Sequence, residues 1–107
     1  MEQIKDITPK QLTEGVTGYY AHGQNMTLGL VELKAGSYVP LHDHIHEQVT
    51  YLIEGELKMM IGGKEYILTP GSYHVIGSNV LHDALAVKDC KVIDAFAPVR
   101  EEYKMKT

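Results

Sequence analysis

With 107 residues, the chain has room for one domain with one core, so a single domain over residues 1–107 is expected. Its 44% hydrophobic and 22% charged content and its net charge of −4, without a basic run, argue against nucleic acid or an anionic membrane as a partner. No apolar run approaches the roughly 20 residues of a membrane-spanning helix, and the single cysteine, Cys90, with no secretory signal, predicts a cytoplasmic protein.

Short apolar runs separated by glycine and proline follow one another along the chain, with almost no helical periodicity. Residues 1–20 are less regular and are expected to form an N-terminal arm, an edge strand or a partner contact. The pattern then predicts strands at 25–33, 38–44, 48–54, 56–61, 64–68, 73–76, 82–87 and 90–97. Closely spaced turn signals, such as Gly62-Gly63, without a crossover helix favour an all-β antiparallel barrel or jelly-roll sandwich.

The stretch HDHIHEQ, residues 42–48, places histidines at three alternate positions and a glutamine two residues later. In a straight strand His42 and Gln48 would lie about 20 Å apart, whereas metal–ligand bonds are only about 2 Å long. The chain must therefore bend if both are ligands. We expect His42 and His44 to end one strand, residues 45–47 to turn, and Gln48 to begin the next. His46 then sits in the turn and need not be a ligand.

A further ligand is expected from a distant strand, and His82 begins the strand predicted at 82–87. Two imidazoles at i and i+2 on a strand edge converge readily on one ion, which favours His42 and His44. His22 and His74 stand alone, and an isolated histidine is more often a surface or hydrogen-bonded core residue. The expected metal site therefore consists of four residues: His42, His44, Gln48 and His82.

Residues 36–55, GSYVPLHDHIHEQVTYLIEG, resemble the first motif of the cupin family, with Gln48 where the last ligand is usually glutamate. Residues 69–82, TPGSYHVIGSNVLH, resemble the second motif, whose histidine is His82 here. The departures from that motif fall at turn positions: Ser72, Gly77 and Asn79. The resemblance covers roughly residues 25–97. It implies a double-stranded β-helix, the cupin jelly-roll barrel, with one divalent ion near one mouth.

Residues 40–76 and the later run DCKVIDAFAPVREEY, residues 89–103, look more closely like the cupins of pectin and alginate breakdown. Those enzymes convert a cyclic 4,5-unsaturated uronate monomer to its linear keto form. The resemblance implies that the metal ligands are His42, His44, Gln48 and His82. It also implies a catalytic signature within DAFAPVR, formed by Asp94, Phe96 and Arg100, and a carboxylated sugar as the small-molecule substrate.

Three neutral imidazoles and a neutral amide would leave the full 2+ charge on the ion, whether it is Ni, Zn, Mn, Fe or Co. Such an ion is suited to gripping a carboxylate or polarising an oxygen. Asp94 is expected to be the general acid/base, Arg100 to hold a carboxylate, and Phe96 to form a pocket wall. Val92, Asp94 and Phe96 share one strand face, which is a poor place for a solvated surface carboxylate.

Other readings of the same residues stay open. Asp94 and Arg100 could form a surface salt bridge worth little to stability. The protein could be a non-catalytic sensor or carrier of a small carboxylate, or a Mn or Fe cupin that oxidises a small organic substrate. The absence of the two-histidine, one-carboxylate triad disfavours an oxygenase. Because the strand at 48–54 is apolar on both faces, we also expect a homodimer.

Overall fold

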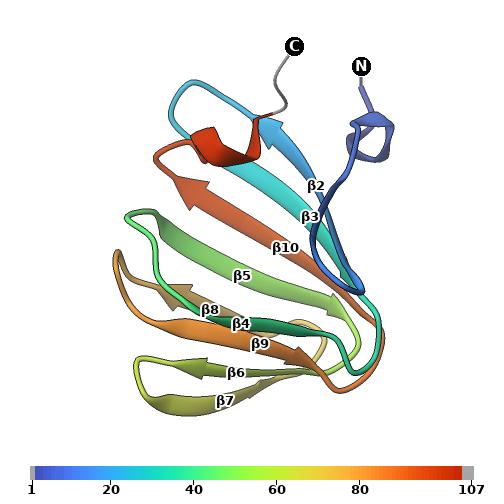
Figure 1. The fold of residues 1–107 in the computed structure, drawn as a ribbon, viewed down its shortest axis with the longest axis vertical. Coiled ribbons are helices and arrows are strands. Elements are labelled where there is room, and N and C mark those ends of the chain that lie inside the picture. The colour runs from blue at the N-terminus through green and yellow to red at the C-terminus, as the bar shows by residue number, and fades with distance from the viewer. Residues whose placement is uncertain (1, 105–107) are drawn as a thin grey trace.

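The computed structural model describes residues 2–104, which form β-strands, two short 3-10 helices and connecting turns (Figure 1). The strands are β1 (Lys10–Thr13), β2 (Val16–His22), β3 (Thr27–Leu33), β4 (Tyr38–His42), β5 (Glu47–Glu54), β6 (Leu57–Ile61), β7 (Lys64–Leu68), β8 (Tyr73–Ile76), β9 (His82–Ala86) and β10 (Cys90–Ala97). The 3-10 helices are η1 (Ile4–Asp6) and η2 (Glu101–Tyr103). The predicted all-β fold is confirmed. No helix among the described residues is long and apolar enough to cross a membrane.

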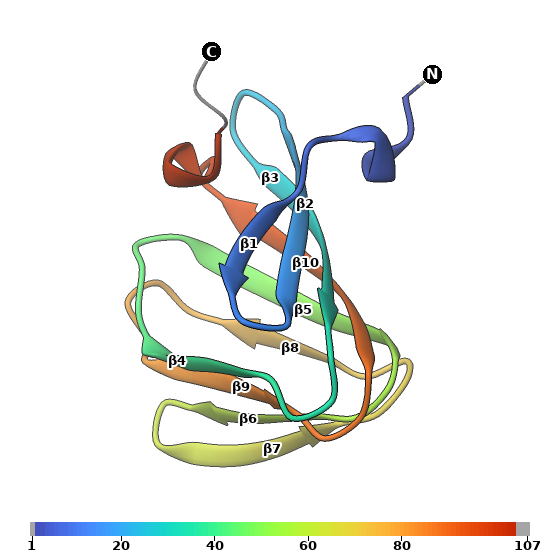
Figure 2. The ribbon, with the colours of Figure 1, turned by 45° about the vertical axis from the view of Figure 1, so that its right-hand side comes forward.

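The strands form two antiparallel sheets that lie against each other (Figure 2). The six-stranded sheet has the order β1-β2-β3-β10-β5-β8, and the four-stranded sheet has the order β4-β9-β6-β7. After β3 the chain passes repeatedly from one sheet to the other, as in a jelly roll. This crossing brings β5 beside β10 and β4 beside β9, although neither pair is consecutive in the sequence.

Of the three possibilities expected for residues 1–20, an arm, an edge strand or a partner contact, the structure shows an edge strand, because β1 lies at the edge of the six-stranded sheet. After η1, the chain forms β1 and β2, and β2 pairs with β3 along its whole length, from Val16 opposite Leu33 to His22 opposite Thr27. The sequence pattern of β2 is weak because Gly18 occupies one of its inward positions, and glycine within a strand contributes no side chain to the apolar alternation.

Two predicted strand ends differ from the structure by two residues, and three others by one residue. The strand predicted at 25–33 begins at Thr27, and the strand predicted at 38–44 ends at His42. His44 therefore lies in the loop between β4 and β5, where its carbonyl oxygen accepts a 2.7 Å hydrogen bond from the backbone N–H of Asn79. This bond ties the β4–β5 loop to the turn before β9, so both loops lie at the same end of the barrel.

The core fills the space between the inner faces of the two sheets. Its buried side chains include Val16, Tyr20, Leu52, Leu57, Met59, Ile76, Val92 and Phe96. On the inner face of the six-stranded sheet the strand registers align polar residues in rows: Asp94 lies between Gly29 and Thr50, and Phe96 lies opposite Gln48. Polar groups thus enter the barrel together at one end of an apolar core.

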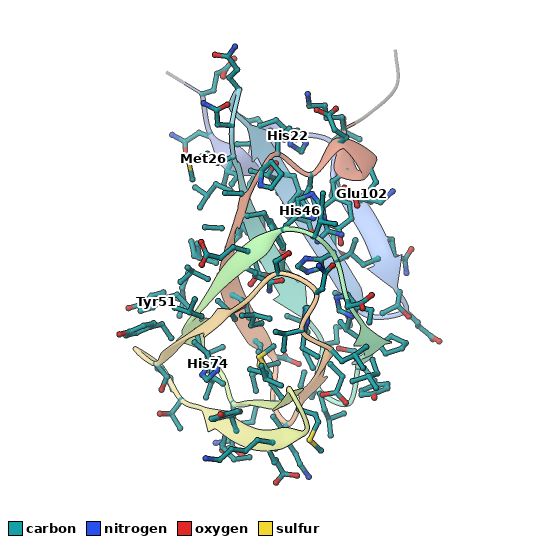
Figure 3. The ribbon with its side chains drawn as sticks, turned by 90° about the vertical axis from the view of Figure 1, so that its left-hand side faces the viewer. His22, Met26, His46, Tyr51, His74 and Glu102 are labelled. Carbon is teal, nitrogen blue, oxygen red and sulfur yellow. The ribbon has the colours of Figure 1, made fainter. Side chains whose placement is uncertain are left out.

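The outer face of β5 is partly exposed, in contrast to its inner face. Thr50 and Leu52 are buried, but Val49 and Tyr51 are 38% and 44% exposed. Figure 3 shows Tyr51 projecting outward from the sheet. Burial was expected on both faces of β5, but in the single chain only its inner face is buried.

Candidate metal centre

The three histidines predicted as ligands meet at one end of the barrel. His42 ends β4 and His82 begins β9, and the antiparallel pairing of these strands sets the two residues opposite each other. His44 reaches the same point from the β4–β5 loop. The ligand nitrogens of the three side chains all lie within 4.8 Å of one another. This histidine cluster can hold one metal ion.

The hydrogen bonds of these histidines define their tautomers. In each ring Nδ1 lies close to a backbone carbonyl oxygen, which can only accept, so Nδ1 carries the proton and Nε2 keeps its lone pair. The acceptors for His42, His44 and His82 are the carbonyl oxygens of Pro40, His46 and Val80, at 2.8, 3.0 and 2.8 Å. Nε2 of His82 is buried and has no hydrogen-bond partner within residues 2–104. Such orienting bonds are typical of metal-binding histidines.

Gln48 joins the cluster through its side-chain oxygen. Its Oε1 lies 3.0 Å from Nε2 of His44, while its Nε2 donates to Oγ1 of Thr50 at 2.8 Å and to Oδ1 of Asp94 at 3.2 Å. Burial, and secondarily the charge of Arg100, lowers the pKa of His44 to about 4, so this imidazole is neutral at pH 7. The lone pair on Nε2 of His44 therefore faces a lone pair on Oε1 of Gln48. This is the arrangement expected of two ligands of one cation. The donor set fits a divalent metal ion.

His46 occupies the bend between β4 and β5, as expected from the sequence. Its carbonyl oxygen orients His44, its buried ring packs edge-on against the His44 ring with 5.3 Å between ring centres, and its Nε2 faces the C-terminal segment. There Nε2 lies 3.3 Å from the carbonyl oxygen of Val99 and 3.9 Å from a carboxylate oxygen of Glu102 (Figure 3). His46 therefore supports the site through its backbone and is not among the clustered nitrogens.

The two isolated histidines lie outside the cluster. Nδ1 of His22 is hydrogen-bonded to Oγ1 of Thr27 at 2.8 Å, and the ring of His74 packs on Tyr66 with 4.3 Å between ring centres. Each of these histidines contacts a neighbouring side chain, as expected from the sequence for an isolated histidine.

Asp94 lies on the inner face of β10, beside the histidine cluster. Its Oδ1 accepts hydrogen bonds from Oγ1 of Thr50 at 2.8 Å and from the amide of Gln48 at 3.2 Å. Burial raises the pKa of Asp94 to about 6, although these hydrogen bonds and the charge of Arg100 act in the opposite direction. Within residues 2–104 no hydrogen bond reaches Oδ2. A carboxyl group of this kind can hold or release a proton near neutral pH.

Arg100 is buried, with 6% of its surface exposed, and does not form the surface salt bridge considered from the sequence. Its guanidinium carbon lies 4.8 Å from the ring centre of Phe96 and 4.0 Å from that of Tyr103. Its Nε lies 3.3 Å from Oε1 of Glu102. Within the described part of the chain, no ion pair joins Arg100 to Asp94.

Most of these residues line one cavity, although His44 is not among its lining residues. Its walls include the polar residues His42, Gln48, Thr50, His82, Asp94 and Arg100, and the aromatic residues Tyr20, Phe96 and Tyr103. Sequence reasoning missed three contributors: Thr50, Tyr20 and Tyr103. Thr50 has the same strand parity as Gln48, so its inward direction was predictable. Tyr20 and Tyr103 come from opposite ends of the chain and carry no local signal of their meeting.

Comparisons with known proteins agree with this architecture. Residues 29–96 match the family model described as Cupin domain. The pectin degradation protein KdgF of Dickeya dadantii (strain 3937) is 27% identical over 104 residues, which cover 94% of each chain. The solved structure of KdgF from Halomonas sp. is 25% identical, with a TM-score of 0.86 over 94% of each chain. An RmlC-like cupin from Shewanella frigidimarina NCIMB 400 is 23% identical, with a TM-score of 0.89 over 96% of this chain and 94% of that one.

Proposed function

The chain belongs to the cupin family, and on that premise we propose that it is a metal-dependent enzyme that converts a cyclic 4,5-unsaturated uronate to its linear keto form. The names of the two KdgF relatives, one of them a pectin degradation protein, support this substrate class. The observation that carries the proposal is the position of Asp94. It is a partly buried carboxyl group with a raised pKa, hydrogen-bonded to Gln48 at the edge of the histidine cluster.

The proposed reaction needs proton transfers and no redox partner. The hemiacetal hydroxyl at C1 loses its proton, the bond between C1 and the ring oxygen breaks, and the ring oxygen takes up a proton. This gives an aldehyde at C1 and an enol at C5. The enol hydroxyl then loses its proton and C4 gains one, which gives the keto form. Product and substrate therefore have the same composition.

Asp94 is the proposed proton carrier for these transfers. Oδ1 is held by Thr50 and Gln48, so the carboxyl plane is fixed and Oδ2 can serve as the atom that takes up and returns the proton. A group with a pKa near the working pH is effective in both directions. A divalent ion held by His42, His44, Gln48 and His82 would supply Lewis acidity for the carboxylate and its neighbouring oxygen.

Arg100 is the proposed anchor for the substrate carboxylate. A planar guanidinium can donate two parallel hydrogen bonds to a carboxylate, and the bond is stronger where water is excluded. Arg100 is the only arginine of a chain with a net charge of −4, and it lies buried in the cavity wall. This placement favours an anionic ligand over a neutral one.

The test is consumption of 4,5-unsaturated galacturonate, followed by the loss of absorbance of its conjugated double bond. Metal-loaded protein should exceed the spontaneous rate, and protein stripped with a chelator should not. A carrier or sensor of small carboxylates would instead bind a saturated uronate with a measurable affinity and leave the spontaneous rate unchanged.

A further inference from the structure

The guanidinium of Arg100 is surrounded by two aromatic rings and the carboxylate of Glu102. Its guanidinium lies between the rings of Tyr103 and Phe96, which are nearly perpendicular at 85° with 6.2 Å between their centres. Although a carboxylate oxygen of Glu102 lies 3.3 Å from Nε, this buried nitrogen forms no hydrogen bond within residues 2–104. The two rings are therefore the main neighbours of the guanidinium besides the carboxylate of Glu102.

Tyr103 is in turn supported by a second tyrosine from the other end of the chain. The ring of Tyr20 on β2 lies 4.5 Å from that of Tyr103, with 36° between the planes. Tyr20 is only 5% exposed. The Tyr20 ring lies directly over two glycines that have no side chain to obstruct it. A Cβ at Gly29 would lie 2.6 Å from one edge of this ring, and a Cβ at Gly18 would collide with its phenol end. Two glycines on adjacent strands thus provide the seat for this ring.

We propose that Tyr103, supported by Tyr20, is a positioning residue that fixes the guanidinium of Arg100 in the cavity for a ligand carboxylate. A cation over an aromatic face is attracted by the ring quadrupole, most strongly where water is excluded. The flat contact also restricts a long side chain that would otherwise sample many rotamers. The contacts of Arg100 with the two rings support its position, whereas the identity of its ligand as a uronate rests on the proposed function.

Nuclear magnetic resonance tests the positioning directly, because Arg100 is the only arginine and its Nε–H group gives a single arginine signal. In the wild type, ring currents should displace this signal from the position of free arginine. Tyr103→Leu keeps an apolar side chain but removes the aromatic face, so the signal should move toward the free position. Tyr103→Phe should keep it in place. Tyr19→Leu is the matched control, since Tyr19 lies on the opposite face of β2 and contacts Lys5.

Kinetics of the metal-loaded protein on 4,5-unsaturated galacturonate test the consequence. Tyr103→Leu should raise KM roughly 5- to 30-fold, as expected for a desolvated cation–π contact, with little change in kcat. Tyr103→Phe should restore KM, and Tyr19→Leu should leave both constants at the wild-type level. A general loss of folding would lower kcat and metal content as well, which separates it from a loss of positioning.

Two results would overturn the positioning role of Tyr103. The first is an arginine signal in Tyr103→Leu at the same position as in the wild type. The second is a signal that moves in Tyr103→Leu while KM stays unchanged. If Tyr103→Leu does not fold, the wild-type protein provides the test. Nuclear Overhauser contacts between the Arg100 side chain and the Tyr103 ring are then expected, and their absence would overturn the positioning role. If the wild type shows no turnover, the proposed function fails. The arginine signal would still report separately whether Tyr103 positions Arg100.

Discussion

The carboxylate of Asp94 accepts a 3.2 Å hydrogen bond from the side-chain amide of Gln48, a residue 46 positions earlier in the chain. A carboxylate oxygen can accept this bond only from the amide nitrogen, so Asp94 determines which end of Gln48 faces the histidines. Oε1 of Gln48 then lies 3.0 Å from Nε2 of His44. The proposed proton carrier and the proposed metal centre are therefore built as one hydrogen-bonded unit.

Gln48→Glu should retain the metal ion but reduce turnover at least about tenfold at neutral pH. The new carboxylate would lie beside that of Asp94, and two neighbouring carboxylates share a proton, which raises one pKa strongly. It would also cancel one charge of the ion and weaken its Lewis acidity. Metal analysis and the absorbance assay measure the two effects. Unchanged turnover in fully metallated Gln48→Glu would mean that a neutral ligand is not needed.

His44→Ala should weaken metal binding far more than His46→Ala. The first change removes an imidazole whose Nε2 faces Gln48, whereas the second keeps the backbone carbonyl that orients His44. His46→Ala should lower stability instead, by about 1–3 kcal/mol, because a buried ring is lost. Metal titration and thermal unfolding of both variants provide the comparison. Equal loss of metal from the two variants would place His46 among the ligands.

The pH dependence of stability should reveal the raised pKa of the Asp94 carboxyl in metal-free protein. Because its pKa is raised to about 6 in the folded state, the folded protein binds this proton more tightly than the unfolded chain does. The resulting stabilisation is present below pH 4 and is lost as the pH rises toward 6. Asp94→Asn should therefore be more stable than wild type at pH 8, by at most about 3 kcal/mol, and equally stable near pH 4. A difference that is the same at both pH values would rule out the raised pKa.

The outer face of the six-stranded sheet should be covered by a second copy of the chain. Val49, Tyr51 and Ile53 of β5 lie beside Tyr73 and Val75 of the edge strand β8, and all are between 38% and 68% exposed. An exposed apolar face can match a twofold-related copy of itself. Light scattering should give the dimer mass, and Tyr51→Lys should shift the protein to monomer. A monomer mass for the wild type over a wide concentration range would contradict this.

Much of the fold follows from local patterns in the sequence. The alternation of apolar residues indicated most strands, and strand parity placed Val92, Asp94 and Phe96 on one inward face, where the structure has them. The spacing of His42, His44 and Gln48 required a bend, and the chain bends there. The edge strand β1 was one of three possibilities for residues 1–20, whereas β2, in which Gly18 interrupts the apolar alternation, was not predicted.

The rest of the site depends on contacts between distant segments. Tyr20 and Tyr103 are 4.5 Å apart between ring centres, yet neither has a sequence context that predicts the other. The orientation of the Gln48 amide depends on Asp94, which reaches it only because β5 and β10 are neighbours in the sheet. These contacts follow from the order in which the strands pair in the jelly roll. The spacing of turns in the sequence does not determine that order.

Turnover of 4,5-unsaturated galacturonate by Asp94→Asn, compared with wild type at equal metal content, tests the central claim most directly. Asparagine keeps the size of the side chain and an acceptor for Thr50 but cannot transfer a proton. If Asp94 is the proton carrier, turnover should fall by about 10²- to 10⁴-fold while folding and metal content persist. A metallated, folded Asp94→Asn protein that turns over as fast as the wild type would contradict this assignment.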